Sequence, residues 1–448
     1  MPYRRRFYDG SAPALVLGKP PVRLGEFERQ GRRLRRRGGV GDVRPHDIVL
    51  LISPRIFPLG REFREKGGTK LKFFRLAGLA RVSDVEGGEV ELERIPSDIA
   101  NDTHVTVLRY ARLRVIVEDL LITLRGDPTA RRDHRQPAIW ASAVADLRVN
   151  RVHGEGAASD FLRLTSCWRP QVSVTFDNLP NDPDHGRYGY GVNIEGATTG
   201  ARIMVRGTTC RHGVTTNQHY VEDPSAIDRA QYVRCGRPFD NLVENSVVRQ
   251  SGNAAFDTHE FAVRTQFVNC VAAQGVRKQL NGGATESTGF RSRGVDTTFS
   301  ACLSVARDDG SRCDTAQAED TLKGHLHGFL DAPQGLGSTT RIVGCRAHCA
   351  LPIGQEGYGY GVLVKPVQTA GLRVADAPEE PLPAPGPHLP VIEECHFEHC
   401  GMGVGVKSGA NIGDRRRILE QNEFTNCGYA LSRDPPDNRD WSDGWDLA

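Results

Sequence analysis

The 448-residue sequence has little of what marks long helices, membrane spans or exported leaders. It holds only 3 methionines, and no stretch keeps apolar residues at helical spacing for more than about three turns. No apolar run reaches the length of a bilayer span, and residues 1–6 lack the apolar core of a secretory signal. We therefore expect a soluble chain with no membrane span and no recognisable signal peptide, whose location the sequence alone leaves unknown.

An excess of one charge is also missing. Lys and Arg number 58 and Asp and Glu 55, so the net charge is only +3, which argues against a nucleic-acid partner. Ten arginines nevertheless fall within residues 1–40, and the chain ends in an acid-rich stretch. We expect residues 1–45 to form a basic, solvated arm and residues 431–448 to form an acidic tail.

The 49 glycines and many short apolar runs indicate strands and turns instead of helices. One phrase, an apolar residue followed three positions later by Cys, Asn, Ser or Thr, recurs at steps of 24 to 50 residues. Its copies begin at Val205, Val243, Phe267, Phe299, Ile342, Ile392 and Leu419. Such an irregular repeat is typical of a solenoid whose coils share a cross-section but differ in loop length, and these residues are predicted to stack in its core.

The chain before the repeats has a different pattern. Short strand candidates within residues 46–110, with a turn at Gly87-Gly88, predict a small β-module. The solenoid is then expected over residues 111–430. The proline-rich segment 366–390 predicts a long surface loop, and this loop or residues 218–240 would wall a binding groove.

The 11 cysteines raise the question of disulfides or a metal site. Cys270, Cys302, Cys345 and Cys395 occupy the repeat position that Ser246 and Asn422 also occupy. An inward stack of small side chains explains this better than ligation does. We therefore predict mostly reduced, buried thiols and no metal centre.

Seven strands can be aligned on their first inward apolar residue, which is Val192, Val214, Phe256, Phe290, Phe329, Val362 or Val404. Side chains alternate in a strand, so residues one and three positions later face outward. Glu195, Asp257, His259, Arg291 and Arg293 then share one patch on adjacent strands, with the C-terminal coils presenting apolar residues at the same positions. These five are the candidate catalytic residues, and the candidate substrate-binding residues around them are Arg211, His212, Asn217, Glu260 and Lys365.

Four of these segments also carry a family resemblance: residues 189–192 (GYGV), 211–216 (RHGVTT), 256–260 (FDTHE) and 289–294 (GFRSRG). In this order they resemble the right-handed parallel β-helix proteins of the pectate-lyase-like superfamily, and more narrowly phage tailspike and prophage-type members. The resemblance covers about residues 45–430. It implies an all-β, right-handed parallel β-helix, a polysaccharide substrate, a possible homotrimer and an extracellular or phage-associated place.

The resemblance is weak for the reaction, since that superfamily includes lyases, hydrolases, epimerases and adhesins. The Asn-Thr-Asp and Gly-His-Gly set of polygalacturonase-like hydrolases is missing. Calcium assists some of the lyases that the sequence resembles, but no cluster of acids is dense enough for a good oxygen cage. We therefore expect no cofactor, with Ca²⁺ as the alternative.

The leading functional hypothesis is an enzyme that cuts an acidic polysaccharide along this outer face. Arg291 and Arg293 would hold a sugar carboxylate, and His259, oriented by Asp257, would be the general base of a β-elimination. Alternatively, Glu195 and Asp257 would act as the two acids of an inverting hydrolase. A non-catalytic glycan-binding spike or adhesin is the alternative from another class, and a purely structural stalk is a third.

Overall fold

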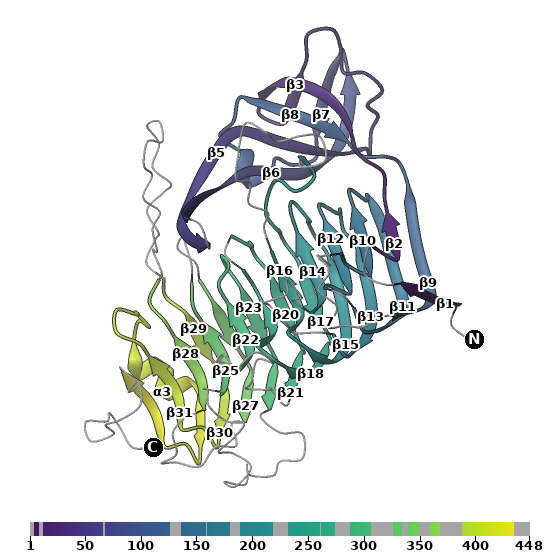
Figure 1. Cartoon of the computed structure of the whole chain (residues 1–448). Coiled ribbons are helices and arrows are strands. Elements are labelled where there is room, and N and C mark those ends of the chain that lie inside the picture. Colours follow the sequence, from purple (N-terminus) through teal and green to yellow (C-terminus); the bar gives the residue numbers. More distant parts are fainter. Residues whose placement is uncertain are drawn as a thin grey trace.

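The computed structural model describes residues 4–8, 12–65, 68–125, 136–157, 159–179, 189–217, 232–259, 261–273, 287–305, 326–333, 339–348, 359–367 and 388–433. Two parallel sheets form a β-helix, and a small closed barrel precedes and flanks it (Figure 1). The predicted fold class, an all-β parallel β-helix with an N-terminal β-module, is confirmed. Among the described residues, no helix has the length and apolar character needed to cross a membrane.

The first sheet has 11 strands, and consecutive coils supply neighbouring strands in parallel. In spatial order they are β2 (Leu15–Leu17), β10 (Ile139–Ser142), β12 (Leu162–Thr165), β14 (Tyr190–Glu195), β16 (His212–Thr216), β19 (Ala254–Asp257), β22 (Ser287–Ser292), β25 (Leu326–Asp331), β28 (Tyr360–Val364), β31 (Met402–Val406) and β33 (Tyr429–Arg433). This sheet carries the candidate site.

The second sheet has 16 strands and forms the other walls of the coils. It starts with long strands, β1 (Arg4–Tyr8), β9 (Arg114–Leu124), β11 (Asp146–Glu155), β13 (Gln171–Asp177) and β15 (Arg202–Cys210). Beyond β15 each coil except the last contributes two short strands instead of one long strand. One row is β17 (Leu242–Glu244), β20 (Gln266–Val268), β23 (Thr298–Ser300), β26 (Arg341–Val343) and β29 (Val391–Glu393). The other is β18 (Val247–Ser251), β21 (Val271–Ala273), β24 (Leu303–Val305), β27 (Arg346–His348), β30 (His396–Glu398) and β32 (Glu423–Thr425).

The predicted core stack is confirmed for most of its members. Phe267, Phe299, Ile342 and Ile392 are aligned coil on coil and buried. The ring centroids of Phe267 and Phe299 lie 5.2 Å apart, within the distance at which stacked aromatic rings attract.

Two members of the stack lie elsewhere than predicted. Val205 is buried as predicted, but Ile203 and not Val205 pairs with Val243; both side chains point inward because they are two residues apart on β15. Leu419 lies in the helix α3 (Arg415–Gln421) and is only partly buried. The helix forms there because the Asp414 side chain accepts a hydrogen bond from the Arg416 amide and so caps the first turn.

The cysteine stack is also as predicted. None of the nine described cysteines forms a disulfide; Cys313 and Cys349 lie outside the described residues. Each stacked thiol lies 3.3 to 3.5 Å from a main-chain carbonyl oxygen of the preceding coil: Cys270 from Val243, Cys302 from Phe267, Cys345 from Phe299 and Cys395 from Ile342. The Asn422 amide donates to Ile392 in the same way. A small side chain at this position therefore satisfies a carbonyl inside each coil.

The glycine that opens most strands of the 11-stranded sheet has a packing reason. A Cβ at Gly191 would lie 2.3 Å from the Phe176 ring, and a Cβ at Gly361 would lie 2.4 Å from the Phe397 ring. Both rings belong to the opposite sheet. The Gly-Val and Gly-Phe steps of the sequence therefore mark positions where a side chain of the opposite sheet packs directly against the strand.

The barrel consists of β3 (Val22–Gln30), β4 (Arg33–Arg35), β5 (Ile48–Glu65), β6 (Gly68–Glu86), β7 (Glu89–Leu92) and β8 (His104–Arg109). Residues 1–45, predicted as a separate arm, are used differently. β1 and β2 join the first coil of the β-helix, and β3 and β4 complete the barrel. Several basic residues of this stretch form ion pairs, among them Arg35 with Glu89 of β7 and Arg32 with Glu91 of the same strand.

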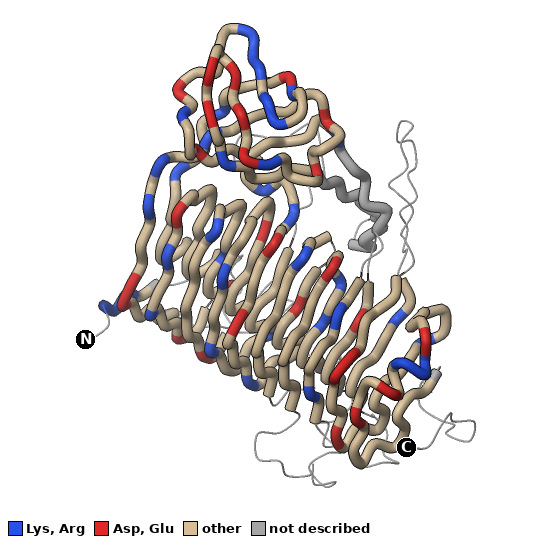
Figure 2. Tube along the Cα trace, turned by 180° about the vertical axis from the view of Figure 1, so that it is seen from behind, with Lys and Arg blue, Asp and Glu red and all other residues tan. Residues whose placement is uncertain are grey.

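The barrel is anchored on the β-helix by polar and apolar contacts. Arg237 donates two hydrogen bonds of 2.7 and 2.8 Å to Asp98, and the Tyr110 hydroxyl donates to the Ser166 carbonyl at 2.6 Å. Residues of both units, among them Leu50 and Trp168, share one apolar cluster. Positive and negative residues are interspersed along the coils (Figure 2), so the candidate site does not stand out by charge in the chain trace alone.

Candidate functional site

The outer face of the 11-stranded sheet has the register that the sequence predicted. Val192, Val214, Phe256, Phe290, Phe329, Val362 and Val404 are aligned strand by strand and fully buried. The outward row beside them reads Asn193, Thr215, Asp257, Arg291, Leu330, Leu363 and Gly405. Polar residues therefore occupy the middle coils, and a separate apolar cluster that contains Leu330 and Leu363 occupies the C-terminal ones.

Asp257 is the centre of the polar part of this face. Its Oδ1 accepts a hydrogen bond from Arg291 Nε at 2.7 Å, and its Oδ2 accepts one from Arg293 Nη2 at 2.5 Å. Thr215 Oγ1 donates to Oδ2 at 3.3 Å, and His259 Nε2 lies 3.2 Å from the same oxygen. The structure thus brings together four of the five predicted catalytic residues.

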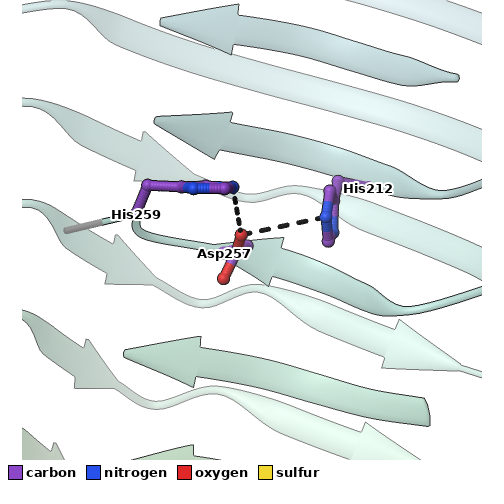
Figure 3. Close-up of side chains that lie close together, drawn as sticks. All are labelled: His212, Asp257 and His259. Atoms are coloured by element: carbon purple, nitrogen blue, oxygen red, sulfur yellow. Dashed lines mark ion pairs between the residues drawn. The ribbon is translucent and has the colours of Figure 1, made fainter. Parts of the chain in front are cut away.

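His212 completes this cluster from β16. Its Nε2 lies 3.8 Å from Asp257 Oδ2, and its Nδ1 lies 2.6 Å from the Ala254 carbonyl, which makes Nδ1 the protonated nitrogen. Figure 3 shows His212 and His259 on either side of Asp257. Strict alternation would place His212 on the same inward side as Val214, two residues later. A Cβ at Gly213 would instead point inward, 2.1 Å from a methyl carbon of Val248. The alternation is therefore interrupted at Gly213, and His212 faces outward.

Burial and charge fix the protonation of these groups. Burial alone would raise the pKa of Asp257, but Arg291 and Arg293 outweigh it and hold that pKa well below its ordinary value of 3.8. Burial lowers the pKa of His259, and the nearby Arg293 lowers it further. Burial likewise lowers the pKa of His212 well below 6.5. At neutral pH the cluster therefore holds an ionised carboxylate, two neutral imidazoles and two guanidinium ions.

Exposure separates the residues of the cluster. The side chains of Arg291, Arg293 and His259 are 16%, 13% and 22% exposed, whereas Asp257 is fully buried and His212 nearly so. The prediction that Asp257 would itself be solvent-accessible is therefore wrong. Its short side chain lies beneath the two guanidinium groups that bond to it, so arginine and His259 form the accessible surface.

A metal ion fits this cluster poorly. His212, Asp257 and His259 offer three ligand atoms within 4.8 Å of one another. Both oxygens of Asp257 already accept hydrogen bonds from arginine, and two guanidinium ions repel a further cation. Calcium also prefers oxygen ligands, and imidazoles supply two of the three here. The cluster suits an anion better.

Glu195 belongs to a second cluster, two strands before Asp257 in the sheet. Asn193 Nδ2 donates to Glu195 Oε1 at 2.8 Å and to Asp160 Oδ2 at 2.9 Å. Arg163 Nε lies 2.7 Å from the same Asp160 oxygen and 3.6 Å from Glu195 Oε1. The acid that accompanies Glu195 is therefore Asp160 and not Asp257.

Sequence reasoning missed Asp160 and Arg163, although a signal for them exists. Leu162 pairs with Val192 in the sheet, so extending the strand alignment one coil toward the N-terminus places Arg163 in the outward row beside Asn193. Asp160 then corresponds to Tyr190, the residue before the inward glycine. The seven strands aligned from the sequence begin at β14, one coil after β12.

The remaining predicted binding residues are dispersed. Arg211 is partly buried, and its charge contributes to the lowered pKa of His212. Asn217 is partly buried just after β16, where its backbone amide donates to the Ile194 carbonyl of the preceding coil. Lys365 follows β28, far along the sheet beside the apolar cluster. Glu260 and the expected groove walls at residues 218–231 and 368–387 lie outside the described residues.

The fold and this face define a parallel β-helix protein with an arginine-rich cluster around a buried carboxylate. No protein-family model matches the chain. Solved structures similar to it include the tailspike gp49 of Pseudomonas phage LKA1, with 13% identity and a TM-score of 0.48 over 95% of this chain and 63% of that one. The gp54 tailspike of Acinetobacter baumannii bacteriophage AP22, solved with a capsular saccharide, matches with 9% identity and a TM-score of 0.47 over 88% and 60%. The chain thus spans about 60% of the length of these two tailspikes.

Proposed function

We propose that the protein binds an acidic polysaccharide across the outer face of its 11-stranded sheet and cleaves it by β-elimination. The observation that carries the proposal is the cluster of Arg291, Arg293 and His259 around buried Asp257. Two guanidinium ions meet one carboxylate there, and both imidazoles have lowered pKa values. The partly exposed surface is therefore positive and also carries an unprotonated base.

The arginines would bind the carboxylate of a uronic acid unit. Guanidinium groups bind carboxylates through paired, charge-assisted hydrogen bonds. Arg291 uses Nε and Arg293 uses Nη2 for Asp257, which leaves other N–H groups of each fork for a ligand. Asp257 in this scheme fixes the two forks in position. It is ionised and buried, so it does not itself take a proton from the sugar.

His259 would be the general base. Its lowered pKa keeps the imidazole neutral at pH 7, and it is the most exposed of the side chains around Asp257. With the sugar carboxylate bound to arginine, the neighbouring C–H becomes more acidic. His259 removes that proton, the C–H electron pair forms a carbon–carbon double bond, and the bond to the leaving glycosidic oxygen breaks. That oxygen takes a proton from water.

The test combines turnover with binding. Wild type and His259→Ala are incubated with a panel of uronate polysaccharides, and unsaturated products are followed by their ultraviolet absorbance. We expect wild type to form them and the variant to lose turnover while retaining binding. His153→Ala is the matched control, since His153 is 23% exposed and also lies beside an acid, Asp177, but belongs to the other sheet. Binding by wild type without any product would identify a non-catalytic glycan-binding protein instead.

Hydrolysis is the second candidate, favoured by the pair Asp160 and Glu195. Both carboxylates bond to the same Asn193 amide nitrogen, which places them about as close as the two acids of a retaining glycosidase, roughly 5 Å apart. New reducing ends without ultraviolet-absorbing product, abolished by Glu195→Gln but not by His259→Ala, would identify this reaction. Assembly as a homotrimer remains a separate proposal, which the mass of the native particle tests.

A further inference from the structure

The 16-stranded sheet carries a second histidine cluster, away from the proposed polysaccharide site. His348 ends β27 and Glu398 ends β30, and the two residues are direct register partners on neighbouring coils. His399 follows Glu398 in the turn to the next strand. In the sequence the cluster is visible only as a histidine at the end of one short strand and as an acid followed by a histidine at the end of another.

The three side chains converge on one point. Their ligand atoms all lie within 4.8 Å of one another, and His399 Nε2 is 3.5 Å from Glu398 Oε1. The rings of His348 and His399 have centroids 5.3 Å apart and are nearly perpendicular, at 89°. All three residues are partly exposed, so an ion can reach them from solvent.

The backbone explains how two adjacent residues reach the same point. Neighbouring side chains in a strand face opposite ways, but His399 has a φ of 51°, in the left-handed region that histidine adopts more readily than most residues. Its amide donates to the Thr425 carbonyl in the next coil. The turn therefore redirects the His399 imidazole toward Glu398.

The charge of this cluster differs from that around Asp257. Among the described residues, the ion pair of Glu398 is with His399 and with no arginine. With neutral imidazoles the cluster carries one negative charge and two ring nitrogens that can accept a metal. In the cluster around Asp257, by contrast, arginine occupies both carboxylate oxygens.

We propose that His348, Glu398 and His399 bind one divalent transition-metal ion of the Zn²⁺ type. Two imidazoles and a carboxylate are common zinc ligands, and water fills the fourth position of such an open site. Ligand atoms about 2.1 Å from one tetrahedral ion lie roughly 3.4 Å apart, so small side-chain rotations close the site. Magnesium and calcium are disfavoured because they prefer oxygen ligands. The ion would tie two coils near the C-terminal end of the β-helix together.

The experiment uses the full chain after removal of metal with a chelator. Zn²⁺ is titrated by calorimetry, and Co²⁺ binding is followed by its visible absorption. We expect one ion per chain and a melting temperature that rises with free Zn²⁺. Glu398→Gln and His399→Asn should each weaken binding at least tenfold; Asn is chosen because it also tolerates the left-handed conformation.

Two control variants locate the ion. His396→Ala removes a histidine of the same strand whose Nε2 contacts Thr425 Oγ1 at 3.0 Å, outside the three-ligand cluster. His212→Gln removes a nitrogen from the other candidate cluster. Both controls should bind Zn²⁺ as wild type does. Absence of saturable binding, unchanged affinity in Glu398→Gln and His399→Asn, or loss of binding in either control would overturn the assignment. None of these outcomes depends on polysaccharide cleavage.

Discussion

Asp257 of β19 and Arg291 of β22 are direct register partners on adjacent strands, and the arginine Nε donates to the carboxylate at 2.7 Å. The pair lies one position beyond the stacked rings of Phe256 and Phe290, whose centroids are 5.0 Å apart. The phenylalanine stack therefore fixes the spacing at which the carboxylate meets the guanidinium. Core packing and the geometry of the candidate site are set by the same two strands.

The first prediction is that Asp257→Asn destabilises the fold. The change removes the only carboxylate that Arg291 and Arg293 share among the described residues and leaves two partly buried cations that repel each other. Breaking a buried ion pair costs about 3–5 kcal/mol, and chemical denaturation should show a loss of this size. Asp119→Asn is the control, because Asp119 makes a comparable two-bond pair with Arg151 on the surface. Equal losses in the free energy of unfolding for the two variants would show that burial of Asp257 does not increase the cost of breaking its ion pairs.

The thiols give a second prediction. Eight of the nine described cysteines are buried and none forms a disulfide, and burial raises the pKa of Cys167 to about 12. Burial shields the sulfur atoms from reagents, and a raised pKa keeps Cys167 from forming the reactive thiolate, so thiol reagents should modify the buried cysteines slowly in the native protein and rapidly after denaturation without reductant. Fewer than about half of the 11 cysteines reacting in the denatured chain would indicate disulfides and an oxidising compartment.

The sequence predicted the register of the 11-stranded sheet because large apolar residues recur with the two-residue period of a strand. Phe256, Phe290 and Phe329 anchor it, and one wrong step would have buried Arg291. The same rule cannot separate Ile203 from Val205, since both point inward and are two residues apart. Leu419 was misplaced because a capped helix interrupts the repeat there.

The composition of the site was harder to predict than its register. Alternation shows which face a side chain occupies but not what covers it, so the complete burial of Asp257 was not foreseen. The sequence predicted His212 as a binding residue but did not predict its approach to Asp257, because the alternation of β16 is interrupted at Gly213. Asp160 lies two residues before β12, and outside a strand the alternation of side chains does not predict which way a residue faces.

Acid should destabilise the protein in two steps. Below pH 6.5 the unfolded chain protonates His212 and His259, while the folded chain, in which both pKa values are lowered and that of His212 lies well below 6.5, resists protonation; stability therefore falls as the pH falls through this range. Asp257 adds a second loss below pH 3.8, toward its lower folded pKa. Melting temperatures measured across pH should show both steps, and His212→Gln should flatten the first. An unchanged first step in that variant would assign it to other groups.

We predict that binding of the polysaccharide requires the paired N–H groups of the Arg293 guanidinium and not only its positive charge. Arg293→Lys keeps a cation beside Asp257 but loses the paired N–H geometry, so it should weaken binding of a uronate polysaccharide about tenfold or more, which corresponds to ~1.4 kcal/mol. Arg293→Ala would not isolate the binding effect, because the 13% exposure of the side chain and its bond to buried Asp257 predict a loss of stability as well. Lysine separates the two effects. Wild-type affinity in Arg293→Lys would show that the fork makes no contact with the ligand.

The last prediction concerns the pH profile of cleavage. A general base must be unprotonated, so turnover should fall as the pH falls through the pKa of His259. Burial and Arg293 lower that pKa from its ordinary value of 6.5, and the acidic limb of kcat/KM should therefore have its midpoint below pH 6.5. Arg293→Lys keeps the positive charge near His259 and should leave the midpoint low, whereas Arg293→Gln removes the charge and should shift the midpoint upward. The profile is recorded from the ultraviolet absorbance of unsaturated product, only where circular dichroism shows the chain folded. A midpoint above 6.5 in wild type, or one that Arg293→Gln does not move, would exclude His259 as the base and direct attention to the acids of the Glu195 cluster.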